Sequence, residues 1–520
     1  MKRNLRDVLL SVLFFVAAWP EHGFPFLIFV AWVPLLMLSD RFSERPSRGF
    51  FLYVYAVFFL FNLLITYWIW FATPIGAVFA VTVNALLMSL TFWIWHRSRR
   101  RLPPSMYWPF FVTLWMSFEM LHYHWDFEWP WLTMGNVFAA WPSVIQWYEY
   151  TGVFGGSLWV LTGSVLLYFL VKNPSGKKYW IRAALWLILP VLLSLRMYSA
   201  YREKGKEAKV LILQPNIDPW TEKFDRSNVA SADDLIALME QAKEKPDLAV
   251  APETALAQSM QADRLGVYPS VRKLKKYLSE KGFALLTGVS LHRFYYDKNN
   301  LPSTVNKVGG KNLWYTLYNS ALLIEPDGKL MLYHKSILVP GAEKMPYFHL
   351  LKPVFGSLVL DLGGMAGTHT PDSIPKVFPV EGTPVRVAPI ICYESIFGFY
   401  VRKYIRRGAN LPAIITNDGW WKKTGGYRQH FRYASLRAIE TRRDIVRSAN
   451  TGRSGIFDQK GRVLQSLPYG KRGIIEGTVH LNDEETFYVR YGDYPGRLAV
   501  FLAVLFFLYS IGSKRIRLTF

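Results

Sequence analysis

Pro389-Ile390-Ile391-Cys392-Tyr393-Glu394-Ser395 ends an apolar, β-prone run that begins at residue 385, and it holds the only cysteine among the 520 residues of the chain. A single cysteine has no disulfide partner within its own chain. Most lone cysteines are small buried hydrophobic residues. This one leads into a polar turn, where a backbone can bend and expose a nucleophile. The stretch is compatible with a packing residue and with a reactive thiol.

Two further apolar runs upstream each end in a charged residue. The run 247–254 delivers the carboxylate of Glu253, and the run 330–335 delivers the ammonium of Lys335. A carboxylate near a thiol can take its proton, an ammonium can stabilise an oxyanion, and a thiolate can attack an acyl carbon. Most strand-end charges are simply solvated, but three in matching contexts favour a reactive site. The order Glu253, Lys335, Cys392 resembles the nitrilase, or carbon-nitrogen hydrolase, superfamily.

The composition is that of a membrane protein with a globular part. The chain is 51% hydrophobic and 16% aromatic, and its net charge is +23. Hydrophobic residues concentrate before about residue 200 and after residue 497, and the roughly 290 residues between them are enough for a sizeable core. We therefore predict an N-terminal membrane domain over 1–200, a globular domain over 206–490 and a C-terminal transmembrane helix over 496–513.

Eight apolar segments predict transmembrane helices. Seven precede the globular part and one follows it, at 8–20, 24–38, 50–70, 76–95, 107–121, 153–171, 180–195 and 498–511. Several are shorter than the ~20 residues that span a bilayer core, and the first two and the last are the least secure. The first has the basic flank of a signal peptide, but residues 17–20 make a poor cleavage site, so we expect it to be retained.

Lysine and arginine alternate between the connections. They occur at 41–48, 97–101 and 172–178, whereas the connections 21–23, 71–75 and 122–152 contain none. Short cytoplasmic loops retain these residues. We therefore expect a cytoplasmic N-terminus, a globular domain outside the cytoplasm, and a final segment that returns Lys514, Arg515 and Arg517 to the cytoplasm. Much of the positive charge then reflects topology, which removes the argument for nucleic-acid binding.

The globular part alternates strand and helix signals. Strands are expected at 209–217, 284–289, 320–324 and 413–416, and helices at 233–243, 270–281 and 429–443. Turn signals such as Pro326-Asp327-Gly328 separate paired strands. This alternation predicts an α/β layered fold.

The motifs resemble those of one branch of the superfamily, the apolipoprotein N-acyltransferases, over nearly the whole chain. They are Ala251-Pro252-Glu253-Thr254-Ala255, His334-Lys335-Ser336-Ile337-Leu338-Val339-Pro340 followed by Glu343, Ile391-Cys392-Tyr393-Glu394, Thr416-Asn417-Asp418-Gly419-Trp420, Leu436-Arg437-Ala438-Ile439-Glu440 and Ser448-Ala449-Asn450-Thr451-Gly452. The resemblance implies a multi-pass α-helical membrane bundle plus an α/β nitrilase-like four-layer α-β-β-α sandwich.

The resemblance also implies roles for individual residues. Cys392 would be the nucleophile, Glu253 the general base and Lys335 the oxyanion support. Supporting positions would be Glu343, Tyr393 and Glu394, and substrate-binding positions Phe224, Asn319 and Trp420. The chain departs from the family pattern at Phe224, where many members have tryptophan, and at Trp421-Lys422, where they often have Phe-Gly. The loop 344–370 is left without roles.

The activity that the resemblance implies has two steps. Cys392 takes an acyl chain from a membrane phospholipid as a thioester, and the amino group of a diacylglyceryl-modified apolipoprotein cysteine then attacks it. No cofactor or metal and no nucleic acid is implied. The resemblance places the enzyme, as a monomer, in the bacterial cytoplasmic (inner) membrane with its catalytic domain on the periplasmic side.

Three other interpretations remain open from the residues alone. A membrane-tethered nitrilase-like amidase would use the same three residues, with water resolving the acyl-enzyme. A Cys-His protease would use His334 or His430 as its base, although His430 in a helical run is more simply a surface or packing residue. A scaffold or transporter with an inactive domain would not need Glu253, Lys335 and Cys392 together. The scattered histidines and single cysteine offer no metal-ligand cluster.

Overall fold

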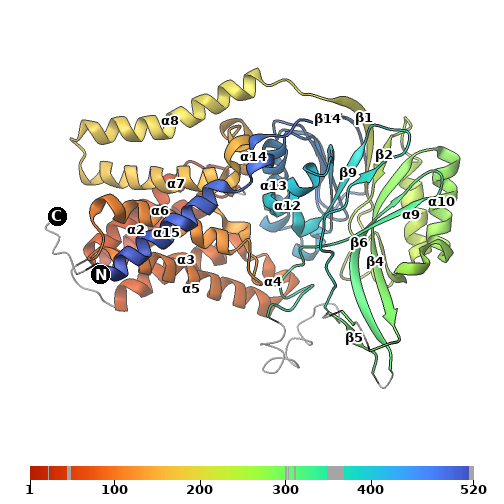
Figure 1. Cartoon of the computed structure of the whole chain (residues 1–520), viewed down its shortest axis with the longest axis horizontal. Helices are drawn as coiled ribbons and strands as arrows, with labels where there is room; N and C mark the ends of the chain where they lie inside the picture. The colour runs from red at the N-terminus through yellow and green to blue at the C-terminus, as the bar shows by residue number, and fades with distance from the viewer. Residues whose placement is uncertain are drawn as a thin grey trace. The chain divides into compact units, whose positions relative to one another are not determined.

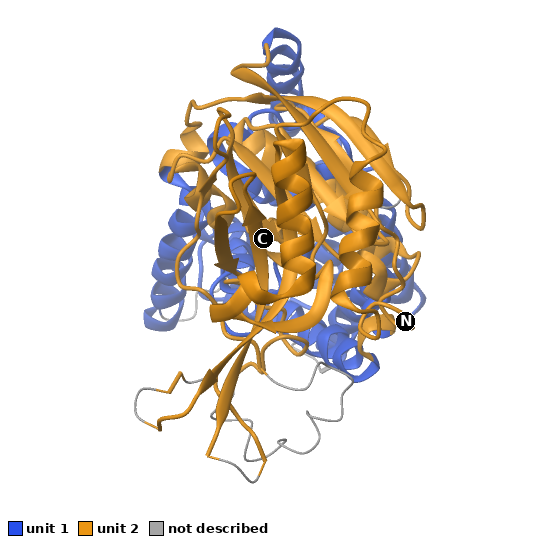
Figure 2. Ribbon diagram, turned by 90° about the vertical axis from the view of Figure 1, so that its right-hand side faces the viewer, with its two compact units in different colours: residues 1–70, 74–201, 491–520 blue, residues 71–73, 202–490 orange. Residues whose placement is uncertain are grey.

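The chain forms two compact units. A computed structural model describes residues 1–20, 23–43, 48–298, 301–302, 304–309, 312–347 and 368–513. One unit comprises residues 1–70, 74–201 and 491–520, and the other residues 71–73 and 202–490 (Figure 2). The basic residues expected at 514–517, and most of the loop 344–370, lie outside the described residues.

The first unit is helical. Its long helices are α1 (Lys2–Ala18), α2 (Leu27–Arg41), α3 (Arg48–Thr66), α5 (Pro74–Ser98), α6 (Pro104–Leu121), α7 (Tyr148–Lys172), α8 (Lys177–Ala200) and α15 (Tyr494–Gly512), with the short α4 (Ile69–Ala72) after α3. Three 3₁₀ helices, η1 (Pro130–Leu132), η2 (Met134–Ala140) and η3 (Pro142–Val144), form the aromatic connection from α6 to α7.

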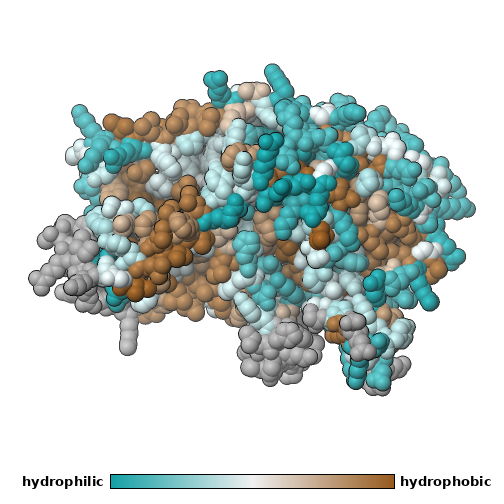
Figure 3. Space-filling model, viewed as in Figure 1, coloured by the Kyte–Doolittle hydropathy of each residue, from teal (hydrophilic) through white to brown (hydrophobic). Residues whose placement is uncertain are grey.

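Five of the described helices are long and apolar enough to cross a membrane: α3 over Gly49–Thr66, α5, α7, α8 and α15. The helices α1 and α2, with 17 and 15 residues, are shorter than a simple bilayer span, and α6 is not among the five. The last apolar segment, expected at 498–511, lies within α15, which is continuous over 19 residues. Hydrophobic side chains gather on the surfaces of α8 and α15 (Figure 3), as expected of helices that face lipid. The multi-pass helical bundle is confirmed.

The second unit begins with an eight-stranded sheet. Its strands are β1 (Lys206–Gln214), β2 (Leu248–Val250), β3 (Leu256–Gln261), β4 (Ala284–Tyr295), β5 (Asn306–Lys307), β6 (Trp314–Ile324), β7 (Leu330–His334) and β14 (Gly473–Leu481). The order is β14-β1-β2-β4-β6-β5, with β3 on β4 and β7 on β6. Helices α9 (Asn228–Met239) and α10 (Pro269–Lys281) cover one face, and the 3₁₀ helix η4 (Ala262–Val267) leads into α10. Leucine, valine and methionine side chains of these helices and strands form one apolar core.

A six-stranded sheet follows. Its strands are β8 (Phe378–Pro379), β9 (Arg386–Ile391), β10 (Leu411–Thr416), β11 (Ile445–Ala449), β12 (Ser454–Phe457) and β13 (Val463–Leu467), ordered β13-β12-β11-β10-β9-β8. The strands β9, β10 and β11 run parallel, so their carboxyl ends share one edge. Between the strands lie η5 (Cys392–Ile396), α12 (Gly398–Ile405), η6 (Asp418–Trp421) and α13 (Gly425–Thr441), and α14 (Phe487–Tyr491) follows β14.

The two sheets pack face to face. Strand β1 contacts β11, and β6 contacts β9. Helices α9 and α10 lie outside the first sheet, and α12 and α13 lie on the other side, beyond the second sheet (Figure 1). The predicted four-layer α-β-β-α sandwich is therefore confirmed, and it brings the ends of strands from both sheets to one place.

Two elements have boundaries that differ from those the sequence predicts. The helix expected at 233–243 is α9, which begins at Asn228 because the Ser227 hydroxyl caps it by accepting from the Ala230 N–H. The strand expected at 284–289 extends to Tyr295, because β4 pairs with β6 along its whole length. Pairing of this kind depends on a strand distant in sequence, so a local pattern does not predict it.

Candidate active site

The three residues predicted to carry the chemistry stand at strand ends. Glu253 follows β2, Lys335 directly follows β7, and Cys392 directly follows β9 and begins η5. The first two come from the eight-stranded sheet and Cys392 from the six-stranded sheet. All three are buried, with exposed fractions of 5%, 1% and 8%. The face-to-face packing of the sheets thus assembles one enclosed site.

Lys335 lies between two carboxylates. Its Nζ donates to Glu253 Oε1 at 3.3 Å and to Glu343 Oε1 at 2.9 Å. Asn319 Nδ2 donates to the same two oxygens, at 2.7 and 2.9 Å. Burial lowers the pKa of Lys335, but Glu343 and Glu253 outweigh burial and raise that pKa above its ordinary range. Lys335 therefore stays a cation at all working pH values.

Glu343 is held by a turn that follows Lys335. Its Oε2 accepts the backbone N–H of Val339 at 2.9 Å. Burial raises the pKa of Glu343. The Lys335 ammonium, His369 and the hydrogen bonds from Val339 and Asn319 together outweigh burial, so the pKa is lowered. Glu343 is thus an ionised partner that balances the charge of Lys335.

The Glu253 turn is fixed by a second buried lysine. Glu253 Oε2 accepts the N–H of Asn417 at 3.0 Å. Lys223 Nζ donates to the Glu253 carbonyl at 2.9 Å and to Thr254 Oγ1 at 2.6 Å. Thr254 has a φ of +46°, which few residues other than glycine adopt. Burial lowers the pKa of Lys223 to about 8. Lys223 therefore stabilises a strained turn that aims the Glu253 carboxylate.

A glycine beneath this turn allows the close approach. A Cβ on Gly288 of β4 would lie 2.3 Å from the Thr254 nitrogen and 2.6 Å from the Glu253 Cα. The Gly288 N–H donates to the Pro252 carbonyl at 3.0 Å. The turn packs directly on the backbone of β4, so a side chain at Gly288 would displace it.

Cys392 occupies a bend of the kind that exposes a nucleophile. Its φ is +49°, a left-handed conformation that is strained for a residue with a side chain. The Ser395 hydroxyl donates to the Cys392 carbonyl at 2.7 Å and supports the bend. Burial raises the pKa of the Cys392 thiol, Glu253 raises it further, and Lys335 opposes them. The thiol is thus protonated at rest.

Glu394 ties the segment of Lys335 to the segment of Cys392. Its Oε2 accepts the N–H of Ile391 at 2.8 Å, and its Oε1 accepts the N–H of Ser336 at 2.7 Å and the hydroxyl of Tyr333. The side chain is fully buried. Burial raises the pKa of Glu394 to about 7, although its donors favour the carboxylate. Glu394 acts by position, because it links the two halves of the site.

His430 supports the Cys392 bend from below. Its Nδ1 is 3.0 Å from Asp418 Oδ1, and its Nε2 is 3.3 Å from the Cys392 carbonyl and 3.0 Å from Ser395 Oγ. Arg447 donates to both Asp418 oxygens at 3.0 Å. Of the two simple expectations for His430, surface or packing, the structure shows packing, since His430 is 1% exposed. Its ring nitrogens contact the carboxylate and the backbone carbonyl, which makes it a structural support.

His334 contacts residues of its own sheet and has no contact with Cys392 among the hydrogen bonds of the described residues. Its Nδ1 lies 2.7 Å from the hydroxyl of Ser320, and its ring stacks on Tyr318 at 4.2 Å. Burial lowers the pKa of His334 to about 4. A neutral imidazole in this setting packs against its sheet.

The residues predicted for substrate binding fall into two groups. Phe224 stacks on Trp420 with centroids 5.9 Å apart, and Trp220 meets Trp420 edge-on at 5.1 Å. Asn319 instead lies inside the charge network and bridges the two carboxylates. Tyr393 is 4% exposed and packs edge-on against Phe397. The aromatic group thus stands next to the polar network along the chain, because Phe224 follows Lys223 and Trp420 lies three residues after Asn417.

Sequence reasoning missed the burial of Lys223 and the contact between Asp418 and His430. Lys223 stands beside Phe224, in a stretch singled out by resemblance, but nothing in its sequence signals burial. Asp418 lies within a quoted motif, yet its partners are 12 and 29 residues away. Among the residues that the structure describes, no group of three or more His, Cys, Asp or Glu side chains is placed to hold a metal ion.

Comparison with known proteins agrees with this geometry. Residues 209–488 match the family model described as Carbon-nitrogen hydrolase, and residues 11–166 match the model described as Apolipoprotein N-acyltransferase N-terminal domain. The chain belongs to the carbon-nitrogen hydrolase family. Within that family, the resemblance to the apolipoprotein N-acyltransferases is confirmed, because the N-terminal match is the domain that defines them.

Curated relatives cover nearly the full length. The chain is 29% identical to an apolipoprotein N-acyltransferase from Chlorobaculum tepidum, over 98% of this chain and 96% of the relative. It is 27% identical to an apolipoprotein N-acyltransferase from Geobacter metallireducens, over 94% of this chain and 92% of the relative. A solved carbon-nitrogen hydrolase from Helicobacter pylori is 15% identical, covers 55% of this chain and 92% of its own, and has a TM-score of 0.37.

Replacing Gly288 tests whether the Glu253 turn rests on β4. Gly288→Ala places a Cβ against backbone, so we expect the free energy of unfolding to fall by about 1–3 kcal/mol and acyl transfer to drop with it. Thermal unfolding of the purified protein in detergent measures the first effect. Gly266→Ala is the control, because a Cβ there meets nothing within 4 Å. Equal melting temperatures for the two variants would contradict the packing argument.

Replacing Glu394 tests its role as a link. In Glu394→Gln the amide NH₂ group faces N–H donors, which leaves buried groups unpaired and costs about 1–3 kcal/mol of stability. The matched control is Glu244→Gln, at an exposed carboxylate that pairs with Lys209 on the surface. Thermal unfolding should separate the two variants by several degrees. A melting temperature for Glu394→Gln equal to that of Glu244→Gln would show that Glu394 does not hold the site together.

Proposed function

We propose that the protein transfers an acyl chain from a membrane phospholipid to the N-terminal amino group of diacylglyceryl-modified apolipoproteins, through a thioester on Cys392. The observation that carries the proposal is the buried group of Glu253, Lys335 and Cys392 in a chain that also has helices able to cross a membrane. The names of the full-length relatives support the lipoprotein substrate.

In the first step Cys392 attacks the ester carbonyl of the phospholipid. Glu253 takes the proton from Sγ as the carbon–sulfur bond forms, because the thiol is protonated at rest. The Lys335 ammonium stabilises the oxyanion that develops on the carbonyl oxygen. The intermediate then breaks its carbon–oxygen bond, and the lysophospholipid leaves with the proton that Glu253 had taken.

In the second step the apolipoprotein amine attacks the thioester. Glu253 accepts a proton from the amine, Lys335 again supports the oxyanion, and the carbon–sulfur bond breaks to leave the amide. The released thiolate regains the proton from Glu253. Each half-reaction thus uses the same base and the same cation, and the free enzyme returns to its resting protonation.

The competing reaction is hydrolysis of the thioester. A membrane-tethered amidase would differ from the proposed acyltransferase only in using water in place of the amine. Spanning helices favour lipid substrates over small soluble amides, and a buried thiol, 8% exposed, limits access by water. The ring positions of His334 and His430 give a Cys-His protease no support.

We also propose that the catalytic unit lies on the periplasmic side of the inner membrane and that the protein acts as a monomer. The argument for orientation is the alternation of lysine and arginine between the apolar segments.

The first test of the mechanism is formation of the thioester with phospholipid alone. Glu253→Gln keeps the shape but removes the basicity, and Lys335→Met removes the oxyanion donor, so each should lower the rate of acylation by ~10²-fold or more. Intact-protein mass spectrometry measures the acyl mass, with Cys392→Ala as the blank. A Glu253→Gln enzyme that acylates at the unaltered rate would rule out the general-base role.

Reporter fusions test the orientation separately from the chemistry. A reporter fused after Tyr201 should be active outside the cytoplasm, and one fused after Phe520 should be active inside it. Alkaline phosphatase and green fluorescent protein give opposite readouts on the two sides. If both fusion points report the same side, the number of membrane crossings assigned here is wrong.

A further inference from the structure

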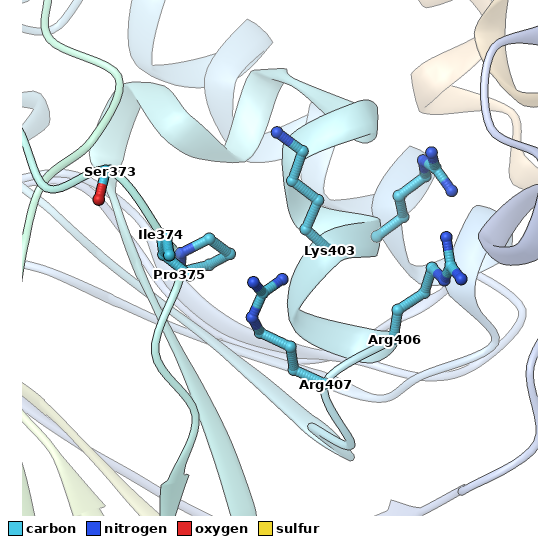
Figure 4. Close-up of a pocket in the computed structure, with 7 residues that line it drawn as sticks. Ser373, Ile374, Pro375, Lys403, Arg406 and Arg407 are labelled. Carbon is cyan, nitrogen blue, oxygen red and sulfur yellow. The ribbon is translucent and has the colours of Figure 1, made fainter.

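A basic cavity lies at the end of α12, apart from the buried charge network of Glu253 and Lys335. Its volume is about 420 Å³, and its lining consists of Ser373, Ile374, Pro375, Arg402, Lys403, Arg406 and Arg407. Four of the seven lining residues are cations, and none is an acid. In Figure 4, Lys403 extends from the helix and Arg407 from the chain just after it, both on the side of Ile374 and Pro375.

The cations of this cavity lack acidic partners. Among the described residues, no carboxylate forms a salt bridge with Lys403, Arg406 or Arg407. The nearest acid along the chain, Asp372, pairs with Lys376 at 2.8 Å. Burial lowers the pKa of Lys403, and Arg402 and Arg407 lower it further. The like charges thus repel one another, and a bound anion would relieve that repulsion.

The helix dipole explains only part of this arrangement. Basic residues are favourable near a helix C-terminus, and Arg402 and Lys403 lie in the last turn of α12. That effect needs one or two charges near the axis. It does not require four cations around a single cavity, with Arg406 and Arg407 beyond the end of the helix.

Two observations favour a lipid over a free anion. Ile374, on the wall of the cavity, is 51% exposed, which provides an apolar contact beside the cations. Arg402 Nη1 donates to the Val489 carbonyl at 2.7 Å, and Val489 is five residues before the spanning helix α15 begins at Tyr494. Five residues reach at most about 18 Å. The segment that Arg402 binds therefore leads directly into a helix able to cross a membrane.

We propose that this cavity binds the phosphate of an anionic phospholipid headgroup, with Lys403 and Arg407 as the principal contacts. Guanidinium and ammonium groups both bind phosphate oxygens strongly, and arginine does so through two parallel hydrogen bonds. The site would hold lipid against the catalytic unit whatever reaction Cys392 performs.

The test uses the full chain in detergent with the Cys392→Ala substitution, so that bound lipid is not consumed. Calorimetry measures the affinity for short-chain phosphatidylglycerol, short-chain phosphatidylcholine and inorganic phosphate. Removing two phosphate-binding charges with Lys403→Gln and Arg407→Gln should weaken phosphatidylglycerol binding at least tenfold. Phosphatidylcholine, whose headgroup carries no net charge, should bind more weakly. Its affinity should also change less than that of phosphatidylglycerol when the two cations are removed.

The matched control removes one lysine and one arginine from another exposed helix face. Arg272→Gln with Lys276→Gln on α10 should change the affinity less than twofold. Thermal unfolding checks that both double variants fold. If both double variants lose the same affinity for phosphatidylglycerol, or if neither loses any, the proposal is overturned, because the lipid is then not bound by the cations of this cavity. Inorganic phosphate that binds as tightly as phosphatidylglycerol would also overturn it, by making this a free-anion site.

Discussion

The buried ammonium of Lys335 between the carboxylates of Glu253 and Glu343 is the interaction on which the site depends. Removing one member of a buried ionic group costs about 3–5 kcal/mol, because it leaves a charge without a partner. Asn319 binds both carboxylates and so keeps them in place without adding charge. The arrangement holds the Glu253 carboxyl group in one position, which the proposed base needs before its substrate arrives.

That network belongs to one sheet, whereas the thiol belongs to the other. Glu394 crosses between them by accepting from Ile391 on one side and Ser336 on the other, and Asn417 crosses back to Glu253. The chemistry thus depends on the face-to-face packing of two sheets. Each sheet is stable only with helices on its outer face, so the four layers are required for the site as well as for the core.

The resting state has consequences for the proposed reaction. The thiol of Cys392 is protonated because it is buried beside a carboxylate, and its backbone is held in a strained conformation. In the proposed reaction the thiol becomes reactive only when Glu253 takes its proton, so the resting protein holds it in the less nucleophilic form. The strain is carried by hydrogen bonds from Ser395 and His430 to the Cys392 carbonyl region, and Arg447 and Asp418 hold His430 in turn.

The sequence by itself determined the residue types, their order and the strand ends on which Glu253, Lys335 and Cys392 stand, because apolar runs that stop at a polar residue are local patterns. It also determined that the chain crosses a membrane, since hydrophobicity is a property of segments. Only the tertiary structure decided the partners. Lys223 appears as an ordinary charged residue until the fold buries it against the Glu253 turn, and only the fold shows that Asn319 of β6 binds two carboxylates. His430 was expected at a surface or in packing, and only the burial of most of α13 decided for packing. The physical reason is the same in each case: burial and hydrogen-bond geometry depend on contacts between residues distant in sequence, which no local pattern contains.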